Sequence, residues 1–329
     1  MLSGPRTGDS VVLAAKALRS TVIEDASVQA AMQPWIEMEC YQLSTGKQLA
    51  RMETLDLGSQ QIVRESQATS VQKLGVTPAN LCTLSYCTPT PNFRFSEIGA
   101  SETDSLFFMP EHTEFDIYVP AGAQTAYVSF DQDEFLKGAR ALNPEQWERT
   151  PEQLQQLQTA QQAALKGAIN HWFSMTRELG AYMPAVDKGL MRRLLLENIL
   201  QVATTANLTE SQPPPVERAR AFHICRMART FVEDSLAVDA VPTVTDICRT
   251  IGVSERALQY AFRAYVDLSP VAYLRLCRLN HVRVTLRALD PCTATVTSVA
   301  MRFGFLHLGR FAQDYRQLFD ESPSVTLAC

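Results

Sequence analysis

One sequence pattern occurs twice between residues 243 and 321, and it constrains the fold more than any other feature of the chain. Each copy runs from a threonine through a short apolar stretch to a glycine, and then into a longer amphipathic stretch. Up to the glycine the copies are offset by 52 residues, so that Thr243 pairs with Thr295 and Gly252 with Gly304. Beyond the glycine the offset is 53, because the second copy has one extra turn residue. One copy alone fits an ordinary helical hairpin, but two matched copies favour a duplicated functional motif.

Each copy has the residues that a helix-turn-helix needs. A threonine hydroxyl can accept hydrogen bonds from the free amides of a first helical turn, so Thr243 is an expected N-cap. Gly252 stands where the first helix must stop, because glycine adopts the left-handed conformation without a Cβ penalty. Leu258 and Phe262 have the spacing of a stripe that two crossed helices bury. The sequence therefore predicts two helix-turn-helix motifs.

The segment between the copies predicts a long connecting helix. From Pro270 to Leu289 an apolar stripe recurs at Leu276, Leu279, Val282 and Leu286. Twenty helical residues span about 30 Å. That length is close to the ~34 Å between successive major-groove openings on one face of DNA. A rigid helix of this length can hold two recognition helices in adjacent grooves without dimerisation.

These motifs resemble the DNA-binding domain of the AraC/XylS family of bacterial transcription regulators, over residues ~219–328. The resemblance rests on Ser254-x-x-x-Leu258-Gln-x-x-Phe262, Ser269-Pro270-x-x-Tyr273, Phe303-Gly304-Phe305, Gly309-Arg310-Phe311 and Ser322-Pro323-Ser324-x-Thr326-Leu327. The stretch from Leu306 to Phe311 is similar to the branch that includes the ethanolamine-utilisation regulator. The sequence departs from the family at Cys248, where alanine is usual, and at Asp320-Glu321, where glycine is common.

Length and charge are consistent with a two-domain protein whose DNA-binding part is only mildly basic. At 329 residues the chain exceeds what one core usually supports. Residues 216–329 contain 14 Arg, no Lys and 11 acidic residues, giving 14 − 11 = +3. The remainder contains 16 basic and 24 acidic residues, giving −8, and the sum is the net charge of −5. Charge alone would therefore not identify a nucleic-acid-binding protein.

The cysteines and apolar runs predict a cytoplasmic protein. Its eight cysteines have no paired CxxC spacing, and Cys82 and Cys87 lack the partners of a zinc site. We expect reduced, mostly buried thiols, no metal and no cofactor. The chain has no apolar run of 18 residues and no signal-type segment, so we expect no membrane association.

Residues from about 35 to 135 predict an antiparallel β barrel or sandwich. Short apolar runs such as 81–87 and 125–130 alternate with Gly and Pro every 8–12 residues. The family resemblance implies a cupin-like barrel that binds a small effector, although no motif identifies its binding residues. The expected fold class is thus α+β, with this barrel and its helices followed by an all-α domain that carries two helix-turn-helix motifs on a long helix.

The barrel could instead be catalytic, which would make the protein a DNA-targeted enzyme. A metal-dependent cupin needs several clustered histidines, and this region has only His112, beside Glu111 and Glu114. We therefore expect His112 on a loop or rim and predict no enzyme activity and no catalytic residue. Three arginines and two aromatic residues could instead face a ligand, but we expect the arginines at the surface and the aromatics in the core: Arg51, Arg64, Arg94, Tyr118 and Trp35.

Two helices and a linker are predicted between the barrel and the DNA-binding domain. The stretches 151–178 and 187–202 have helical stripes, which either cap the barrel or, as the resemblance implies, form a dimerisation element. A run of three prolines ends any helix before residue 216. The predicted division is a weakly patterned segment 1–30, an effector-sensing and dimerisation domain 31–206 with its helices at about 151–204, a linker 207–217, and a DNA-binding domain 218–329.

The second helix of each motif, at about 254–265 and 307–319, is the predicted recognition helix. Its N-terminal outward residues should meet base edges in the major groove. Arginine suits guanine and glutamine suits adenine, each pair giving about 1–3 kcal/mol of discrimination. The predicted base-contacting residues are Arg256, Gln259, Tyr260, Arg310 and Gln313. The predicted phosphate-contacting residues are Arg263, His307 and Arg316, although His307 could equally cap the helix.

The sequence thus predicts a DNA-binding transcription regulator that responds to an effector. Double-stranded promoter DNA is the predicted partner, and the resemblance adds a small-molecule effector, RNA polymerase and a homodimer. The resemblance also implies an activator, since nothing in the residues distinguishes activation from repression.

Overall fold

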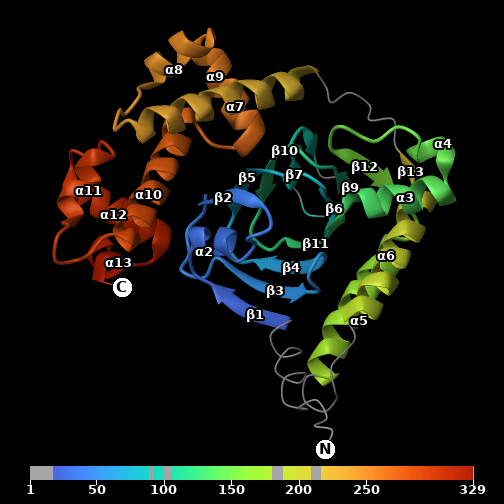
Figure 1. Cartoon of the computed structure of the whole chain (residues 1–329). Coiled ribbons are helices and arrows are strands. Elements are labelled where there is room, and N and C mark those ends of the chain that lie inside the picture. The colour runs from blue at the N-terminus through green and yellow to red at the C-terminus, as the bar shows by residue number, and fades with distance from the viewer. Residues whose placement is uncertain are drawn as a thin grey trace, which may run out of the picture.

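Two antiparallel β-sheets form the centre of the molecule in the computed structural model, which describes residues 18–88, 90, 92–99, 105–179, 188–208 and 216–328 (Figure 1). The larger sheet has the order β1-β3-β4-β11-β6-β9-β12-β13 and the smaller has the order β2-β5-β10-β7-β8. The strands are β1 Leu18–Ile23, β2 Glu37–Gln42, β3 Ala50–Asp56, β4 Gln61–Gln67, β5 Val71–Val76, β6 Leu81–Cys87, β7 Arg94–Phe95, β8 Ile98–Gly99, β9 Ser105–Met109, β10 Glu114–Val119, β11 Gln124–Asp131, β12 Gln155–Gln158 and β13 Asn207–Leu208.

The larger sheet packs helices against its outer face. Along β11, Val128 and Phe130 point outward into a core with Phe135 and Trp147, while Thr125 and Tyr127 face the inside of the barrel. This alternation is the two-residue period of a strand buried on both sides. The covering helices are α3 Gln132–Leu142, α4 Pro144–Trp147, α5 Gln162–Leu179 and α6 Lys188–Thr205.

The smaller sheet packs its outer face against the C-terminal helices. Tyr41 on β2 and Leu74 on β5 belong to the same buried cluster as Tyr273 and Val282 of that domain. The C-terminal helices are α7 Val216–Ala237, α8 Val244–Ile251, α9 Glu255–Val266, α10 Pro270–Ala288, α11 Val296–Arg302, α12 Leu308–Phe319 and α13 Pro323–Ala328. The predicted fold class is confirmed: an antiparallel β domain with helices, then a helical domain in which α10 joins two helix-turn-helix motifs.

Two regions differ from the sequence-based expectation. Residues 151–161 were expected to begin a helix, but 155–158 form β12, because Leu157 is buried where β12 pairs with β9. The segment 1–30 was expected to be weakly patterned, but its described part forms β1, which pairs with β3, and most of the short helix α2 Ala26–Ala31. The prolines of the predicted linker fall at 213–215, outside the described residues. None of the described helices combines the length and the apolar run that crossing a bilayer requires.

Candidate nucleic-acid interface

The first motif has the caps that its sequence predicts. The Thr243 hydroxyl accepts a hydrogen bond from the Asp246 amide, and the Asp246 carboxylate accepts from the Thr243 amide, which completes a capping box. Gly252 ends α8 with φ 70°, the left-handed conformation that glycine adopts without strain. Ser254 then caps α9 by accepting from the Ala257 amide. The turn between the helices is therefore fixed by local hydrogen bonds.

Burial of one face of α9 presents the predicted base-reading residues on the other. Leu258 and Phe262 are buried, whereas Arg256, Gln259 and Tyr260 are exposed. Arg256 Nη2 lies 3.3 Å from the Tyr260 hydroxyl, and the guanidinium lies 5.4 Å from the centre of the tyrosine ring. The two side chains thus form one cationic and aromatic surface at the N-terminal half of α9. Arg263, a predicted phosphate contact, is also exposed.

The second motif repeats this construction with a weaker start to its recognition helix. Thr295 caps α11 by accepting from the Ser298 amide, and Gly304 has φ 76°. A Cβ at Gly304 would lie 2.9 Å from Val241 Cγ1, so close packing as well as conformation requires glycine there. His307 is the N-cap residue of α12 but makes no side-chain capping hydrogen bond. Its exposed imidazole is left available for other contacts.

The exposed face of α12 has Arg310, Gln313 and Arg316, while Phe311 and Tyr315 are buried. A further arginine, which the sequence did not single out, lies beside this face. Arg275 of α10 forms an ion pair with Asp314. Burial lowers the pKa of the Arg275 guanidinium, and the nearby positive charge of Arg310 lowers it further. The start of α12 therefore has two neighbouring guanidinium groups, one of which is paired with Asp314.

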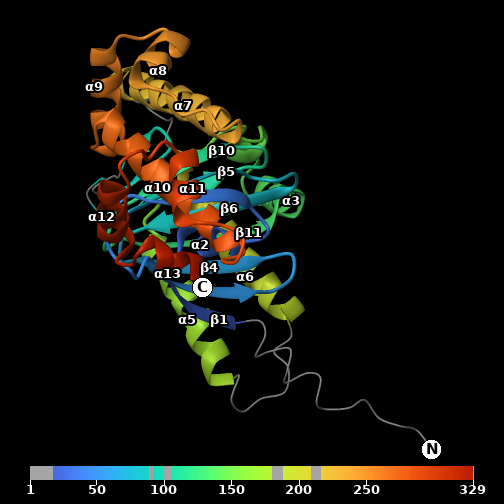
Figure 2. The ribbon, with the colours of Figure 1, turned by 90° about the vertical axis from the view of Figure 1, so that its left-hand side faces the viewer.

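Both recognition helices lie along one side of the molecule. In Figure 2, α9 and α12 follow the same edge, with α10 between them and the β domain behind. The α10 helix has 19 residues, which corresponds to about 28 Å at 1.5 Å per residue. All eight predicted DNA-contacting side chains are exposed on these two helices and their starts: Arg256, Gln259, Tyr260, Arg263, His307, Arg310, Gln313 and Arg316.

A buried polar cluster attaches the first motif to the smaller sheet. Arg94 of β7 was expected at the surface but is only 6% exposed. Its guanidinium lies 3.3 Å from the centre of the Tyr265 ring and 3.4 Å from Asp116. Gln72 donates to Asp116 at 2.9 Å and accepts from Tyr273 of α10 at 2.7 Å. Arg94 thus belongs to the contact between the domains rather than to a ligand site.

A cavity lies between the two sheets of the β domain. Its volume is about 70 Å³, and aromatic and aliphatic side chains such as Phe95 and Phe115 form most of its wall. Lys73, Glu65, Gln33 and Tyr127 contribute polar groups to the wall, as do Thr83, Ser85 and Thr125. Lys73 and Glu65 form an ion pair, and both are buried.

The other candidate side chains lie apart from this cavity wall. Tyr118 packs against the C-terminal core, Arg64 pairs with Glu53, Arg51 is exposed, and Trp35 donates to the Tyr127 hydroxyl at 3.1 Å. His112 is exposed. Within the described ranges, no three His, Cys, Asp or Glu side chains are arranged to hold a metal ion. The seven cysteines that the structure describes are unbridged, and five of them are buried.

Comparison with known proteins identifies the C-terminal part as a helix-turn-helix domain. Residues 247–328 match the family model described as a helix-turn-helix domain. Over 85 residues the chain is 42% identical to the "Probable thc operon regulatory protein" of Rhodococcus erythropolis, covering 26% of each protein. Over 75 residues it is 39% identical to the "XylDLEGF operon transcriptional activator" of Pseudomonas putida, covering 23% of each. The chain thus spans about a quarter of the length of these curated relatives.

A solved structure, the AraC-like transcriptional activator CuxR, aligns with 80% of this chain and 94% of its own. The sequence identity is 14% and the TM-score is 0.38.

Proposed function

We propose that this chain is a sequence-specific DNA-binding transcription regulator of the AraC/XylS type, acting in the cytoplasm as an effector-responsive activator. The observation that carries the proposal is the placement of α9 and α12 on one side of the molecule (Figure 2). The rigid α10 helix joins their motifs, and each presents an arginine and a glutamine outward. Such a pair can enter two adjacent major grooves and read base edges in both.

Arg256, Gln259 and Tyr260 are proposed to read bases in the first groove, and Arg310 and Gln313 in the second. Arg263, Arg316 and His307 are proposed to contact phosphates. His307 has this role in preference to capping because its side chain makes no capping hydrogen bond. Arg275 adds positive charge beside Arg310 and is proposed to strengthen the second contact.

The β domain is proposed to sense the effector in the cavity between its sheets. An apolar wall with a few convergent polar groups is typical of small-molecule sites. The cavity of about 70 Å³ is smaller than the ~150 Å³ that accommodates benzene in an engineered core. Binding would therefore enlarge the cavity by moving side chains in its wall. The polar groups of Lys73, Glu65, Gln33 and Tyr127 would meet the polar end of the effector.

The domain division and partners follow from the same proposal. Residues 31–206 would form the sensing domain, 207–217 the linker and 218–329 the DNA-binding domain. Promoter DNA and RNA polymerase would be partners, and Leu306 to Phe311 supports the branch of the ethanolamine-utilisation regulator. A homodimer is proposed through α6, on which Leu194 is exposed, whereas Leu195 is buried in the core of the β domain.

The test is selection of genomic DNA fragments by the full-length protein at physiological salt, followed by footprinting. We expect a protected stretch that contains two boxes centred about 10 base pairs apart, one for each motif. The genes beside the selected sites would suggest the chemical class of the effector. Equal affinity for selected and random fragments, both without and with candidate effectors, would contradict sequence-specific regulation. A matched screen for turnover would then test the enzyme alternative.

A further inference from the structure

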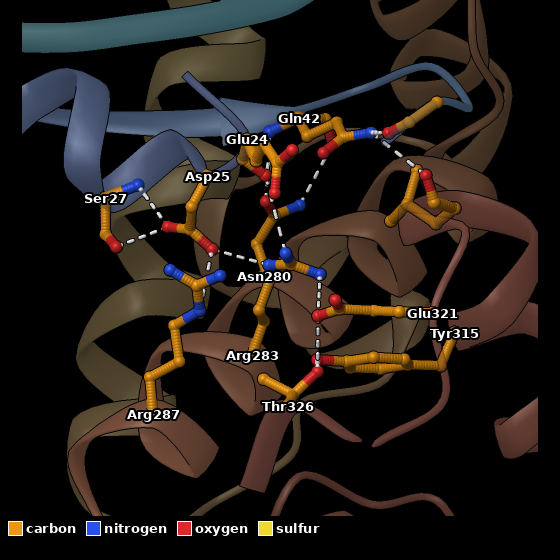
Figure 3. A network of polar contacts seen from close by, with 12 residues as sticks. Glu24, Asp25, Ser27, Gln42, Asn280, Arg283, Arg287, Tyr315, Glu321 and Thr326 are labelled. Carbon is orange, nitrogen blue, oxygen red and sulfur yellow. Dashed lines mark hydrogen bonds and ion pairs between the residues drawn. The ribbon is translucent and has the colours of Figure 1, made fainter. Parts of the chain in front are cut away.

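A second polar contact joins the domains at α2, a short helix whose flanking residues reach α10 at one end and the cavity wall at the other. The Asp25 carboxylate accepts from Arg283 Nε at 2.5 Å and lies 3.4 Å from Arg287 Nε, and both arginines belong to α10 (Figure 3). Arg283 Nη1 lies 2.9 Å from Glu321 Oε1. Asp25 and Arg283 are 2% and 3% exposed. Charges this deeply buried persist only when they are paired.

The contact continues into the last helix of the chain. The Thr326 hydroxyl donates to Glu321 Oε1 at 2.6 Å and lies 2.8 Å from the Tyr315 hydroxyl. Tyr315 is fully buried on α12, the recognition helix of the second motif, and Thr326 lies on α13. Figure 3 shows these side chains in one connected group. The position of Asp25 is therefore linked, through direct contacts, to the helix that presents Arg310 and Gln313.

At the C-terminal end of α2, the chain is hydrogen-bonded to the wall of the cavity. Gln33 follows α2 and is 1% exposed. Its Nε2 donates to Glu65 Oε1 at 3.1 Å, and its Oε1 accepts from the Tyr127 hydroxyl at 2.6 Å. Burial, with the charge of Glu65, raises the pKa of Tyr127, so the hydroxyl stays protonated as this bond requires. Both partners of Gln33 are cavity-lining residues.

The contacts at both ends help to position the α2 helix, together with the buried Gln29 in its middle, whose side chain pairs with Gln67. The helix has six residues, whereas isolated helices shorter than about 12 residues are marginal in water. Asp25 is also its N-cap, since the same carboxylate accepts from the Ser27 amide at 2.8 Å. A movement of α2 would therefore move the partner of Arg283, and a change at Gln33 would alter the support of α2.

We propose that α2 transmits the state of the barrel cavity to the second helix-turn-helix motif, through Gln33 on one side and the Asp25–Arg283–Glu321 contact on the other. This inference rests on the proposed function, in which the cavity takes the effector. A ligand that takes the place of Gln33 at Glu65 or Tyr127 would release α2, and with it the constraint on α10, α12 and α13. The first motif, attached through Arg94 and Asp116, would keep its position.

Hydrogen exchange of the full-length protein without ligand tests the proposal. The variant Gln33→Leu removes both cavity hydrogen bonds. We expect exchange in 280–288 and 315–328 to become about 2- to 30-fold faster, the range for single substitutions along a coupled network. Exchange in α8 and α9 should stay unchanged. As the matched control, Thr83→Val alters the same cavity from β6 and should leave 280–288 and 315–328 unchanged.

Two further variants keep the test decisive. Tyr127→Phe removes the hydrogen bond to Gln33 and the one from Trp35 but leaves the bond from Gln33 to Glu65, and it should produce a smaller change in the same segments if Gln33→Leu does not fold. In an Asp25→Asn background, Gln33→Leu should add no further acceleration in 280–288 and 315–328, because the link is already broken. Acceleration that is additive, or that stays within the β domain, would overturn the proposal. None of these readouts uses DNA, so failure of the regulator proposal would appear separately, as unselective binding in the fragment selection.

Discussion

Both helix-turn-helix motifs begin at a capping threonine and turn at a left-handed glycine, and their recognition helices also end alike. The α9 helix ends at Asp267 and α12 at Asp320, each with φ 55°. A serine and a proline follow in both copies and begin the next helix, α10 or α13. The inner construction of the two motifs is therefore alike, apart from the uncapped start of α12, and local residues determine it.

The attachment of the two motifs to the β domain is different. The first motif contacts the smaller sheet through Arg94 and Asp116, where the arginine lies flat on Tyr265. The second contacts α2 through Asp25 and Arg283, and Asn280 of α10 pairs with both backbone groups of Gln42 on β2 at 2.9 and 3.0 Å. Two motifs with the same fold are thus held to one β domain by different contacts. The similar construction of the two motifs and their different attachment to the β domain can be tested separately.

The largest expected effect tests the equivalence. Phe262 of α9 and Phe311 of α12 are core phenylalanines of the two recognition helices and are 1% and 2% exposed. Replacing either with alanine leaves a core cavity and should lower the free energy of unfolding by about 3–5 kcal/mol. Urea unfolding followed by circular dichroism would measure both losses.

The control for this pair is Val271→Ala on α10, where the side chain is 62% exposed. We expect a change within about 0.5 kcal/mol, as for most surface substitutions. A loss of stability at Phe262 with none at Phe311 would show that the second motif does not contribute an equivalent core.

The next effect tests the difference in attachment. Burial alone raises the pKa of Asp25, but hydrogen bonds from Ser27 and Arg283 and the charges of Arg283 and Arg287 outweigh it, so the pKa lies below its ordinary value. Such a carboxylate adds stability above the unfolded pKa of about 4 and loses it as the pH falls through the folded pKa. Asp25→Asn should therefore cost about 3–5 kcal/mol near neutral pH, as expected for breaking a buried pair.

The difference in melting temperature between wild type and Asp25→Asn should shrink as the pH falls below about 4. Glu114→Gln is the matched control, because Glu114 pairs with Arg226 across the same two domains but is 66% exposed. It should cost no more than about 1 kcal/mol at any pH. A wild-type advantage over Asp25→Asn that does not change with pH would contradict the ion-pair explanation.

The contrast between inner construction and attachment also explains what the sequence could predict. The caps, turns and apolar stripes of each motif are determined by residues within a few positions of one another. The spacing of Thr243, Gly252 and Phe262 was therefore sufficient to predict a helix-turn-helix motif. Strands bounded by Gly and Pro, such as β6 and β11, were predicted for the same reason. The sequence alone therefore gave the fold class and the exposed faces of the recognition helices.

The contacts between domains could not be predicted because their partners are far apart in the chain. Asp25 and Arg283 are separated by 258 residues, and no local pattern links them. One signal was available within α10: Asn280 and Arg283 lie four residues after Leu276 and Leu279, which places two polar side chains on the apolar stripe. A polar residue on such a stripe needs a buried partner. The segment 155–158 was misassigned for a similar reason, since its pairing with the distant β9 decides its conformation.

A smaller effect tests which motif reads which box. Arg310→Ala should relax discrimination at one base position in one box by about 1–3 kcal/mol, whereas Arg256→Ala should do so in the other box. Footprinting and selection with each variant on the selected fragments would measure this. Base preferences that stay unchanged in both variants would show that these arginines do not read bases.

The smallest expected effect distinguishes sequence-independent phosphate contacts from base recognition in the two motifs. Arg263 and Arg316 occupy matching positions late in α9 and α12, and both are exposed. A phosphate contact has no sequence information, so alanine at either position should weaken all DNA sequences alike. The slope of log affinity against log salt should decrease by about 0.9 for each lost contact. Equal slope changes would mean that both motifs dock at once. A change for Arg263→Ala alone would mean that the second motif stays off the DNA, as expected if the Asp25 contact restrains it until the cavity is filled.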